Sequence, residues 1–342
     1  MQARTLLLTL CAMALGCNER TSPRPRPVVE SSYESVRSVV DRLDFERYKA
    51  VIRELTQFGD RQQGTERNRE AVDWVERQLI SYGHTNVARH GYMYRDEPRE
   101  NIYATKVGTT LPGEMYIVSA HLDGMGGGEA ADDDASGCVV VLELARALGA
   151  VDMESARSIR FVFWNNEETS LRGSRAYVAD RQSMQGIENP PGSGTFLEPR
   201  WLGVIQHDMV LFDHGYPPAI DQKPDADLDV EYQVSSSMVI ESAKLAGVLH
   251  AANVLYGGGY PAEVGPRMNS TDSDAFADFA ASVSVRENQR ISEIGRGSNP
   301  HRHKPTDAYK TFSEADFRLG FTAARTTLGA IGRLAGVRIV PQ

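Results

Sequence analysis

The feature that most constrains the fold is an alternation of apolar, strand-like segments with helical segments through the middle of the chain. The expected strands are 114–120, 158–164, 201–206 and 281–286, and the expected helices are 135–148, 235–252 and 313–335. Strands that are separated by helices form a largely parallel sheet with helices on both faces. We therefore expect an α/β fold, a single domain with a mostly parallel, mixed β-sheet flanked by helices.

Two amphipathic helices are expected before this region. Apolar residues between Tyr48 and Leu55 fall on one helical face, and Gly59 supplies a stop. The second helix has a candidate N-cap at Thr65 and a closing glycine at Gly83. Both helices are interpreted as packing elements.

Acidic or imidazole side chains follow directly after three of the expected strands. The segments are His121-Leu122-Asp123, Asn165-Asn166-Glu167-Glu168 and Gln206-His207-Asp208. Open α/β sheets place their binding crevice at the carboxyl ends of the strands. The sequence therefore predicts that these polar side chains gather at one edge of the sheet.

A run of three aspartates, Asp132-Asp133-Asp134, precedes the helix that is expected from Ala135. Adjacent carboxylates near a core are costly unless positive charge neutralises them. A helix N-terminus contributes about half a charge, and a divalent cation contributes far more. Asp134 alone can be a helix cap, but capping does not account for the rest of the run together with His121.

Further donors of the same chemical kind occur later in the chain. Because neighbouring side chains diverge at a strand end, Glu167 and Glu168 can serve two roles, one at a metal and one toward a substrate. Asp208 follows the third strand, and His303 lies in the loop 299–307. Imidazole and carboxylate ligands at four or five points suit zinc or a similar divalent ion.

Taken together, these segments resemble the bimetallic zinc aminopeptidase family, whose relatives include glutamate carboxypeptidases, glutaminyl cyclases and the transferrin-receptor ectodomain. The family pattern is His-x-Asp, Asp-Asp-x-Ser-Gly, Asn-x-Glu-Glu, a strand-terminal Asp and His-x-Pro-x-Asp. All five segments occur here in that order, within roughly residues 40–335. The resemblance implies a zinc-exopeptidase-like fold and a metal-dependent exopeptidase.

The resemblance also implies a role for each matching residue. Asp133 would bridge two Zn²⁺ or similar ions, His121 and Asp208 would hold one, Glu168 and His303 would hold the other, Glu167 would be the general base, and Asp123 would orient His121. Two cations about 3.5–4 Å apart lower the pKa of a shared water and stabilise a tetrahedral intermediate. A carboxylate beside that water can move its proton to the leaving amine.

The chain departs from the family pattern in two respects. Some members have a tyrosine directly before the last histidine, where this chain has Arg302. Arg302, or Arg286 at the end of its strand, is a candidate for stabilising the oxyanion. Residues 182–200 and 213–230 form loops that look longer than a minimal member needs, and we expect them to shape access to the site.

The amino-terminal segment is expected to be an export signal. One positive charge is followed by a short apolar run, Leu6–Leu15, which is too short to span a bilayer. Gly16-Cys17 resembles a bacterial lipobox, which predicts lipidation at Cys17; a plain secretory signal is the alternative. We divide the chain into a signal at 1–16, a proline-rich tether at 17–35 and a catalytic domain at 36–342. We expect the protein to be exported, either as a lipoprotein of the cell envelope or as a secreted protein.

Composition argues against a nucleic-acid partner and against a catalytic cysteine. A formal net charge of −9 argues against a nucleic-acid partner, which needs a basic face. We expect a peptide or small aminoacyl substrate, with a membrane contact only through a lipid at Cys17. Without Cys11 and Cys17, only Cys138 remains, and it lies in an apolar run typical of a small buried hydrophobe.

Two other functions fit the same motifs. A single-zinc glutaminyl cyclase would carry out acyl transfer, and a non-catalytic binding ectodomain would keep the fold without the chemistry. The intact ligands and the intact Glu167 favour a peptidase with two metals. Among peptidases, the pattern favours an aminopeptidase over a carboxypeptidase or a dipeptidase.

Overall fold

The computed structural model describes residues 33–213, 228–266, 270–287 and 299–340. The predicted signal, nearly all of the predicted tether and most of the 213–230 loop lie outside these residues. Within the described part of the chain, no helix combines the length and the apolar character that a membrane span requires.

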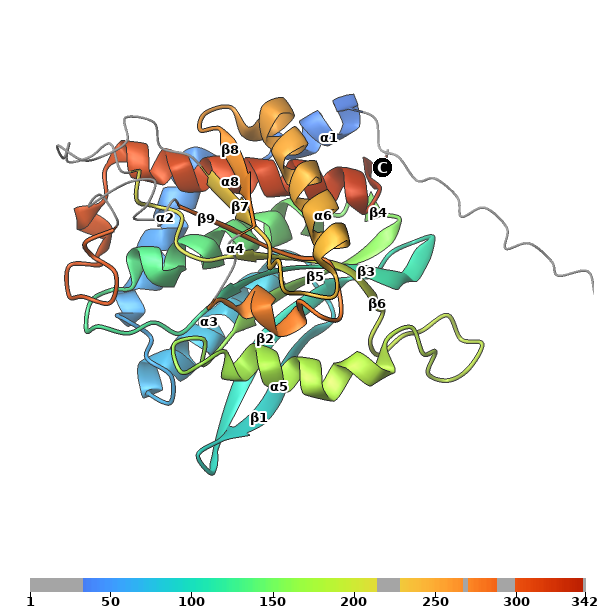
Figure 1. The fold of residues 1–342 in the computed structure, drawn as a ribbon, viewed down its shortest axis with the longest axis horizontal. Coiled ribbons are helices and arrows are strands. Elements are labelled where there is room, and N and C mark those ends of the chain that lie inside the picture. Colours follow the sequence, from blue (N-terminus) through green and yellow to red (C-terminus); the bar gives the residue numbers. More distant parts are fainter. Residues whose placement is uncertain (1–32, 214–227, 267–269, 288–298, 341–342) are drawn as a thin grey trace, which may run out of the picture.

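An eight-stranded mixed sheet forms the centre of the molecule (Figure 1). Its strands, in spatial order, are β1 (Val87–Tyr94), β2 (Glu97–Lys106), β5 (Arg157–Trp164), β3 (Leu111–His121), β6 (Arg200–His207), β9 (Ser282–Glu287), β7 (Leu228–Glu231) and β8 (Ala262–Gly265). The central strands β5, β3, β6 and β9 are parallel to one another, and β7 and β8 are parallel to each other, whereas the pairs β1–β2, β2–β5 and β7–β9 are antiparallel. Two short strands, β4 (Met153–Ser155) and β10 (Val337–Ile339), pair separately.

Helices cover both faces of this sheet, as the strand–helix alternation predicted. The helices are α1 (Tyr33–Val40), α2 (Phe45–Leu55), α3 (Glu66–Ser81), α4 (Gly137–Gly149), α5 (Arg172–Arg181), α6 (Val239–Ala252) and α8 (Glu314–Leu334). In Figure 1, α4, α6 and α8 lie on one side of the sheet and α5 lies on the other. The single α/β domain with a mostly parallel, mixed sheet is confirmed.

Alternating side chains of the central strands form the two halves of the core. In β5, Phe161 and Phe163 pack with the α4 side, while Val162 and Trp164 pack with the α5 side. This arrangement follows from the two-residue period of a strand. Because both faces are covered, β5 is buried from Ser158 to Trp164, and its last four residues are all apolar.

Several element boundaries follow the predictions closely, and two helices start later than expected. Thr65 caps α3 by accepting from the Asn68 amide, and Gly83, with φ of 92°, follows its last turn. The helix expected from Ala135 begins at Gly137, after a separate turn. The helix expected from residue 235 begins at Val239, because Ser236 and Ser237 hydrogen-bond the 277–278 segment instead. Strands β1, β2, β7 and β8 were not predicted.

The 182–200 loop does not lie near the strand-end crevice, so the prediction that it shapes access is wrong. It leads into the first residue of β6, and Phe196 packs against Gly113 near the start of β3. Its Glu198 is buried and pairs with Arg160 at 2.6 Å. The loop therefore lies at the amino ends of the parallel strands, opposite the predicted site.

Candidate metal centre

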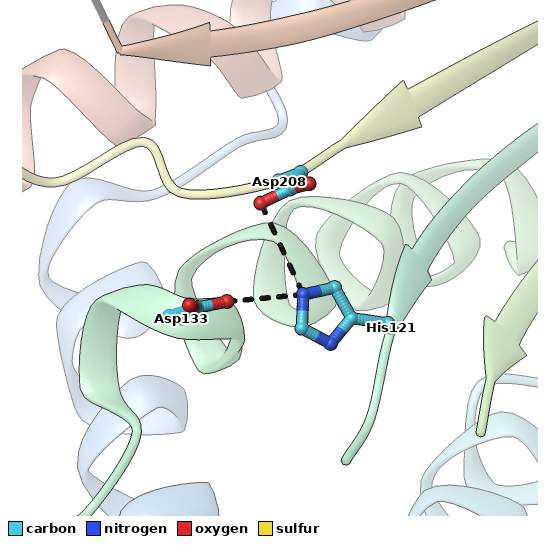
Figure 2. Close-up of side chains that lie close together, drawn as sticks. All are labelled: His121, Asp133 and Asp208. Atoms are coloured by element: carbon cyan, nitrogen blue, oxygen red, sulfur yellow. Dashed lines mark ion pairs between the residues drawn. The ribbon is translucent and has the colours of Figure 1, made fainter. Parts of the chain in front are cut away.

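The carboxyl ends of the parallel strands bring the predicted ligands together. His121 is the last residue of β3, and Asp208 follows the last residue of the neighbouring strand β6. Asp133 comes from the turn Ala131–Ser136, which leads into α4. Figure 2 shows these three side chains pointing toward a common point.

The first donor group is His121, Asp133 and Asp208. The Nε2 atom of His121 lies 3.1 Å from Asp133 Oδ1 and 3.9 Å from Asp208 Oδ1. All three residues are buried.

The second donor group is Asp133, Glu168 and His303. His303 Nε2 lies 3.0 Å from Asp133 Oδ2 and 3.0 Å from Glu168 Oε2. Asp133 thus presents one carboxylate oxygen to each group. All five ligands predicted from the sequence lie in these two groups, and Asp133 is their shared member.

Asp307 fixes the main chain that carries Asp133. Its carboxylate accepts hydrogen bonds from the amides of Asp132 and Asp133, at 2.8 and 3.1 Å. Because Asp307 follows His303 by four residues, the same loop supplies one ligand and positions another.

Asp134 ties three segments of the site to one another. Its Oδ1 accepts from the amides of Gly137, at 3.0 Å, and Met209, at 3.2 Å, and its Oδ2 accepts from the His121 amide at 3.1 Å. The N-cap residue of α4 is Ser136 and not Asp134, but the Asp134 carboxylate still accepts from Gly137, the first residue of the helix. The same carboxylate also holds the ends of β3 and β6 beside the turn.

Asp123 contacts His121 through its main chain and not through its carboxylate. His121 Nδ1 lies 2.7 Å from the Asp123 carbonyl oxygen, an interaction that fixes the ring with Nε2 toward the ligands. The Asp123 carboxylate instead accepts from the Glu167 amide at 3.1 Å. The contact between Asp123 and His121 was predicted from the sequence, but the separate contacts of the Asp123 carbonyl and carboxylate were not.

A buried arginine that sequence reasoning missed holds the loop between His121 and the aspartates. Arg61 donates to the carbonyls of Leu122, Gly59, Glu129 and Ala130 at 2.8–2.9 Å and has no exposed surface. Arginine side chains are rarely buried without such partners. The sequence indicated only that Arg61 lies in a loop, because it follows Gly59, the predicted end of a helix. No motif indicated its role.

Asp272 is a second missed acid near the centre. It is fully buried, and it bonds Ser174 Oγ at 2.5 Å and Gln206 Nε2 at 3.4 Å. Burial, together with the negative charge of Asp208, raises its pKa to about 7. It lies just after the segment 267–269, outside every motif, so only the fold reveals its position.

The charges of the site reflect its excess of carboxylates. Burial raises the pKa of Glu167 and of Glu168, and it raises the pKa of Asp123 to about 7. The carboxylates of Asp133 and Glu168 raise the pKa of His303 to about 9. Without a cation, protons and imidazolium charge must therefore compensate the acids.

The chemistry of the donor groups fits divalent cations such as zinc. In each group the donor atoms lie within 4.8 Å of one another. Glu168 Oε1 is buried and makes no hydrogen bond, and Asp133 Oδ2 and His303 Nε2 face each other at 3.0 Å without hydrogen-bond geometry, although buried polar atoms normally have a hydrogen-bond partner. Oxygen and imidazole donors are also the ligand types that zinc binds.

Two other predicted features are placed as expected. His207 points away from the ligands and contacts the Ser119 carbonyl and Thr327 Oγ1, at 3.2 and 2.9 Å. Cys138 is buried, and its Sγ lies 3.1 Å from the His121 carbonyl oxygen. Burial raises the pKa of its thiol, as expected for a small buried hydrophobe and not for a nucleophile.

Comparison with known proteins assigns the family. The model of peptidase family M28 matches residues 101–317, more than half of the chain. The chain therefore belongs to peptidase family M28, which confirms the resemblance predicted from the motifs. Its donor groups contain the ligand types that metal-dependent hydrolases use.

The curated relatives are named as aminopeptidases or as a leupeptin-inactivating enzyme. Leupeptin-inactivating enzyme 1 of Streptomyces exfoliatus is 28% identical over 41% of this chain and 34% of its own length. Leucine aminopeptidase 1 of Fusarium vanettenii is 26% identical over 59% of this chain and 53% of its own length. The probable lipoprotein aminopeptidase LpqL of Mycobacterium tuberculosis is 38% identical over 26% and 18%. The chain thus spans about half or less of the length of these relatives.

Solved structures share the fold. The aminopeptidase LapA of Legionella pneumophila has a TM-score of 0.67 and 16% identity, over 92% of this chain and 78% of its own. The glutaminyl cyclase of Porphyromonas gingivalis has a TM-score of 0.59 and 20% identity, over 84% and 97%. At this identity the likeness concerns the fold alone.

Proposed function

We propose that this chain is a metal-dependent exopeptidase, an aminopeptidase that hydrolyses the N-terminal peptide bond with two zinc ions and Glu167 as the general base. One observation carries the proposal: two donor groups share Asp133, which offers one oxygen to each. A pair of adjacent cations with one bridging carboxylate is a common arrangement for hydrolysing peptides.

Each ligand has a defined role in this proposal. His121 and Asp208 would hold one ion, Glu168 and His303 would hold the other, and Asp133 would be a ligand of both. Cations held by these residues would supply Lewis-acid chemistry, lowering the pKa of a bound water and polarising the scissile carbonyl. His121, Asp133 and Asp208 are buried, a setting that would strengthen these electrostatic effects.

Glu167 moves the proton in the proposed reaction. It adjoins the ligand Glu168 but belongs to neither donor group, so its carboxylate is free to accept a proton from the water. It then donates that proton to the leaving amine. The Glu167 amide is held by Asp123, which in turn contacts His121, so the base and the first donor group share one support.

Aminopeptidase activity is favoured over the two other functions. The curated relatives with this activity in their names support it, whereas the glutaminyl cyclase shares only the fold. A single-metal cyclase would not need both donor groups, and a binding ectodomain would need neither. Both groups are complete here.

We also propose that the enzyme is exported and that Cys17 carries a lipid. The apolar run before Gly16-Cys17 supports this, and one relative is named as a lipoprotein aminopeptidase. Labelling with a radioactive fatty acid in a bacterial host tests lipidation, with Cys17→Ser as the matched control. A wild-type chain that takes up no more label than this variant would contradict the proposal.

A substrate panel tests the proposed activity. Purified chain, zinc-loaded or chelated, is assayed with aminoacyl p-nitroanilides, with N-acetylated versions of the same compounds and with glutaminyl peptides. We expect zinc-dependent hydrolysis of the free-amine substrates only. Cyclisation of glutaminyl peptides without hydrolysis would establish the cyclase instead, and turnover of neither would contradict an enzyme.

A further inference from the structure

Two arginines contact carboxylates of the metal centre. Arg286 is in β9, and its Nη2 lies 3.3 Å from Asp208 Oδ2. Arg302 directly precedes His303, and its Nε lies 3.5 Å from Asp133 Oδ2. One guanidinium therefore contacts a ligand of the first group, and the other contacts the shared ligand.

The two arginines differ in depth. The side chain of Arg286 is 9% exposed, and its Nε is buried without a hydrogen-bond partner. A buried N–H without a partner is costly and is unusual in a folded protein. The side chain of Arg302 is 46% exposed, so this guanidinium reaches solvent beside the donor groups. Positive charge therefore extends from the buried ligands to the open side of the site.

Arg302 contacts a carboxylate oxygen that the proposed function assigns to a metal. Asp133 Oδ2 faces His303 and belongs to the second donor group. A cation bound to this oxygen would compete with Arg302 for it and would repel the guanidinium. An exposed arginine beside two cations would then have an incoming anion as its partner. A carboxylate is the preferred partner, because its two oxygens match the guanidinium fork.

We propose that Arg302, together with Arg286, binds a carboxylate of the substrate, so that this enzyme prefers substrates with a free carboxylate close to the scissile bond. The inference rests on the proposed peptidase function and specifies its substrate class. The carboxylate can come from the side chain of an N-terminal aspartate or glutamate, or from the C-terminus of a dipeptide.

Matched acid and amide substrates test the preference. The zinc-loaded full chain is assayed with α-glutamyl and α-glutaminyl p-nitroanilide, and with leucyl-glycine and leucyl-glycinamide. We expect kcat/KM to favour the acid by about tenfold or more in one pair, the size expected of a charge-assisted hydrogen bond. The pair that shows the preference identifies the source of the carboxylate.

Variants assign the preference to the arginines. Arg302→Gln should reduce the acid-to-amide ratio of kcat/KM to near one. Arg318→Gln makes the same charge change on α8, where Arg318 is 58% exposed and pairs with Glu314, and it should keep the wild-type ratio. Arg286→Lys keeps a positive charge in the buried position but loses the guanidinium fork, so it should lower the ratio in a folded protein.

Several results would overturn the proposal. A wild-type ratio near one in both pairs would do so, as would an unchanged ratio in Arg302→Gln. An equal fall of kcat for the acid and the amide in that variant would indicate an oxyanion role for Arg302 and would also refute carboxylate binding.

A binding measurement separates this inference from the proposed function. Calorimetry on the zinc-loaded chain compares succinate with its monoamide succinamate. We expect succinate to bind about tenfold more tightly, and Arg302→Gln to remove the difference. If the wild-type chain binds succinate more tightly than succinamate but hydrolyses no substrate, the peptidase is rejected and the carboxylate site is kept. Equal affinities for the two compounds would reject the carboxylate site whatever the activity.

Discussion

Replacing Glu167 by glutamine isolates proton transfer from metal binding. The amide has nearly the same volume, and the main-chain bond from residue 167 to Asp123 does not depend on the side chain. Glu167 belongs to neither donor group, so zinc content should stay at the wild-type level. Only the negative charge and the proton acceptor are lost. General-base catalysis is typically worth about 10²–10⁴-fold, or about 3–5 kcal/mol of activation free energy.

The assay is steady-state hydrolysis of an aminoacyl p-nitroanilide, with zinc content measured on the same samples. We expect Glu167→Gln to lower kcat by about 10²–10⁴-fold with unchanged zinc. Glu46→Gln is the matched control: its side chain is 73% exposed and pairs with Lys49, and it should change neither quantity. A near-normal kcat in Glu167→Gln would refute the role of Glu167 as the base.

Three further substitutions test other parts of the structure. Asp133→Ala removes the shared ligand and should lower metal content by mass spectrometry of the folded protein; unchanged content would refute the bridging assignment. Arg61→Met leaves four carbonyls without their donor and should cost about 3–5 kcal/mol in urea unfolding, a loss that the exposed Arg53→Met should not reproduce. Burial lowers the pKa of His207 from 6.5 to about 4, so its contribution to stability is complete above pH 6.5 and is lost as pH falls toward 4. Between about pH 7.5 and pH 5, His207→Gln should therefore lose about 2 kcal/mol less unfolding free energy than the wild type, and an equal loss would contradict this reasoning.

The fold and the ligand positions were predictable because periodicity and strand ends are local properties of the sequence. The strand before His121 and the strand before Asp208 could be recognised from their apolar residues. Parallel pairing then placed their ends at one edge of the sheet. The order of five motifs supplied the remaining donors.

The rest depended on contacts between segments that are far apart in the sequence. The turn before α4 could not be predicted, because Asp134 bonds residues from β3, α4 and the segment after β6. Arg61 and Asp272 carry no motif, and their partners lie as many as 69 and 98 residues away. The 182–200 loop joins the amino end of β6. This connection, and not the length of the loop, determines its position.

The number of zinc ions per chain tests the central claim most directly. The purified full chain is loaded with zinc, freed of unbound metal by gel filtration and analysed by plasma mass spectrometry against its protein concentration. Two donor groups that share Asp133 predict about two zinc ions per chain. One ion per chain, or none, would contradict a two-metal centre.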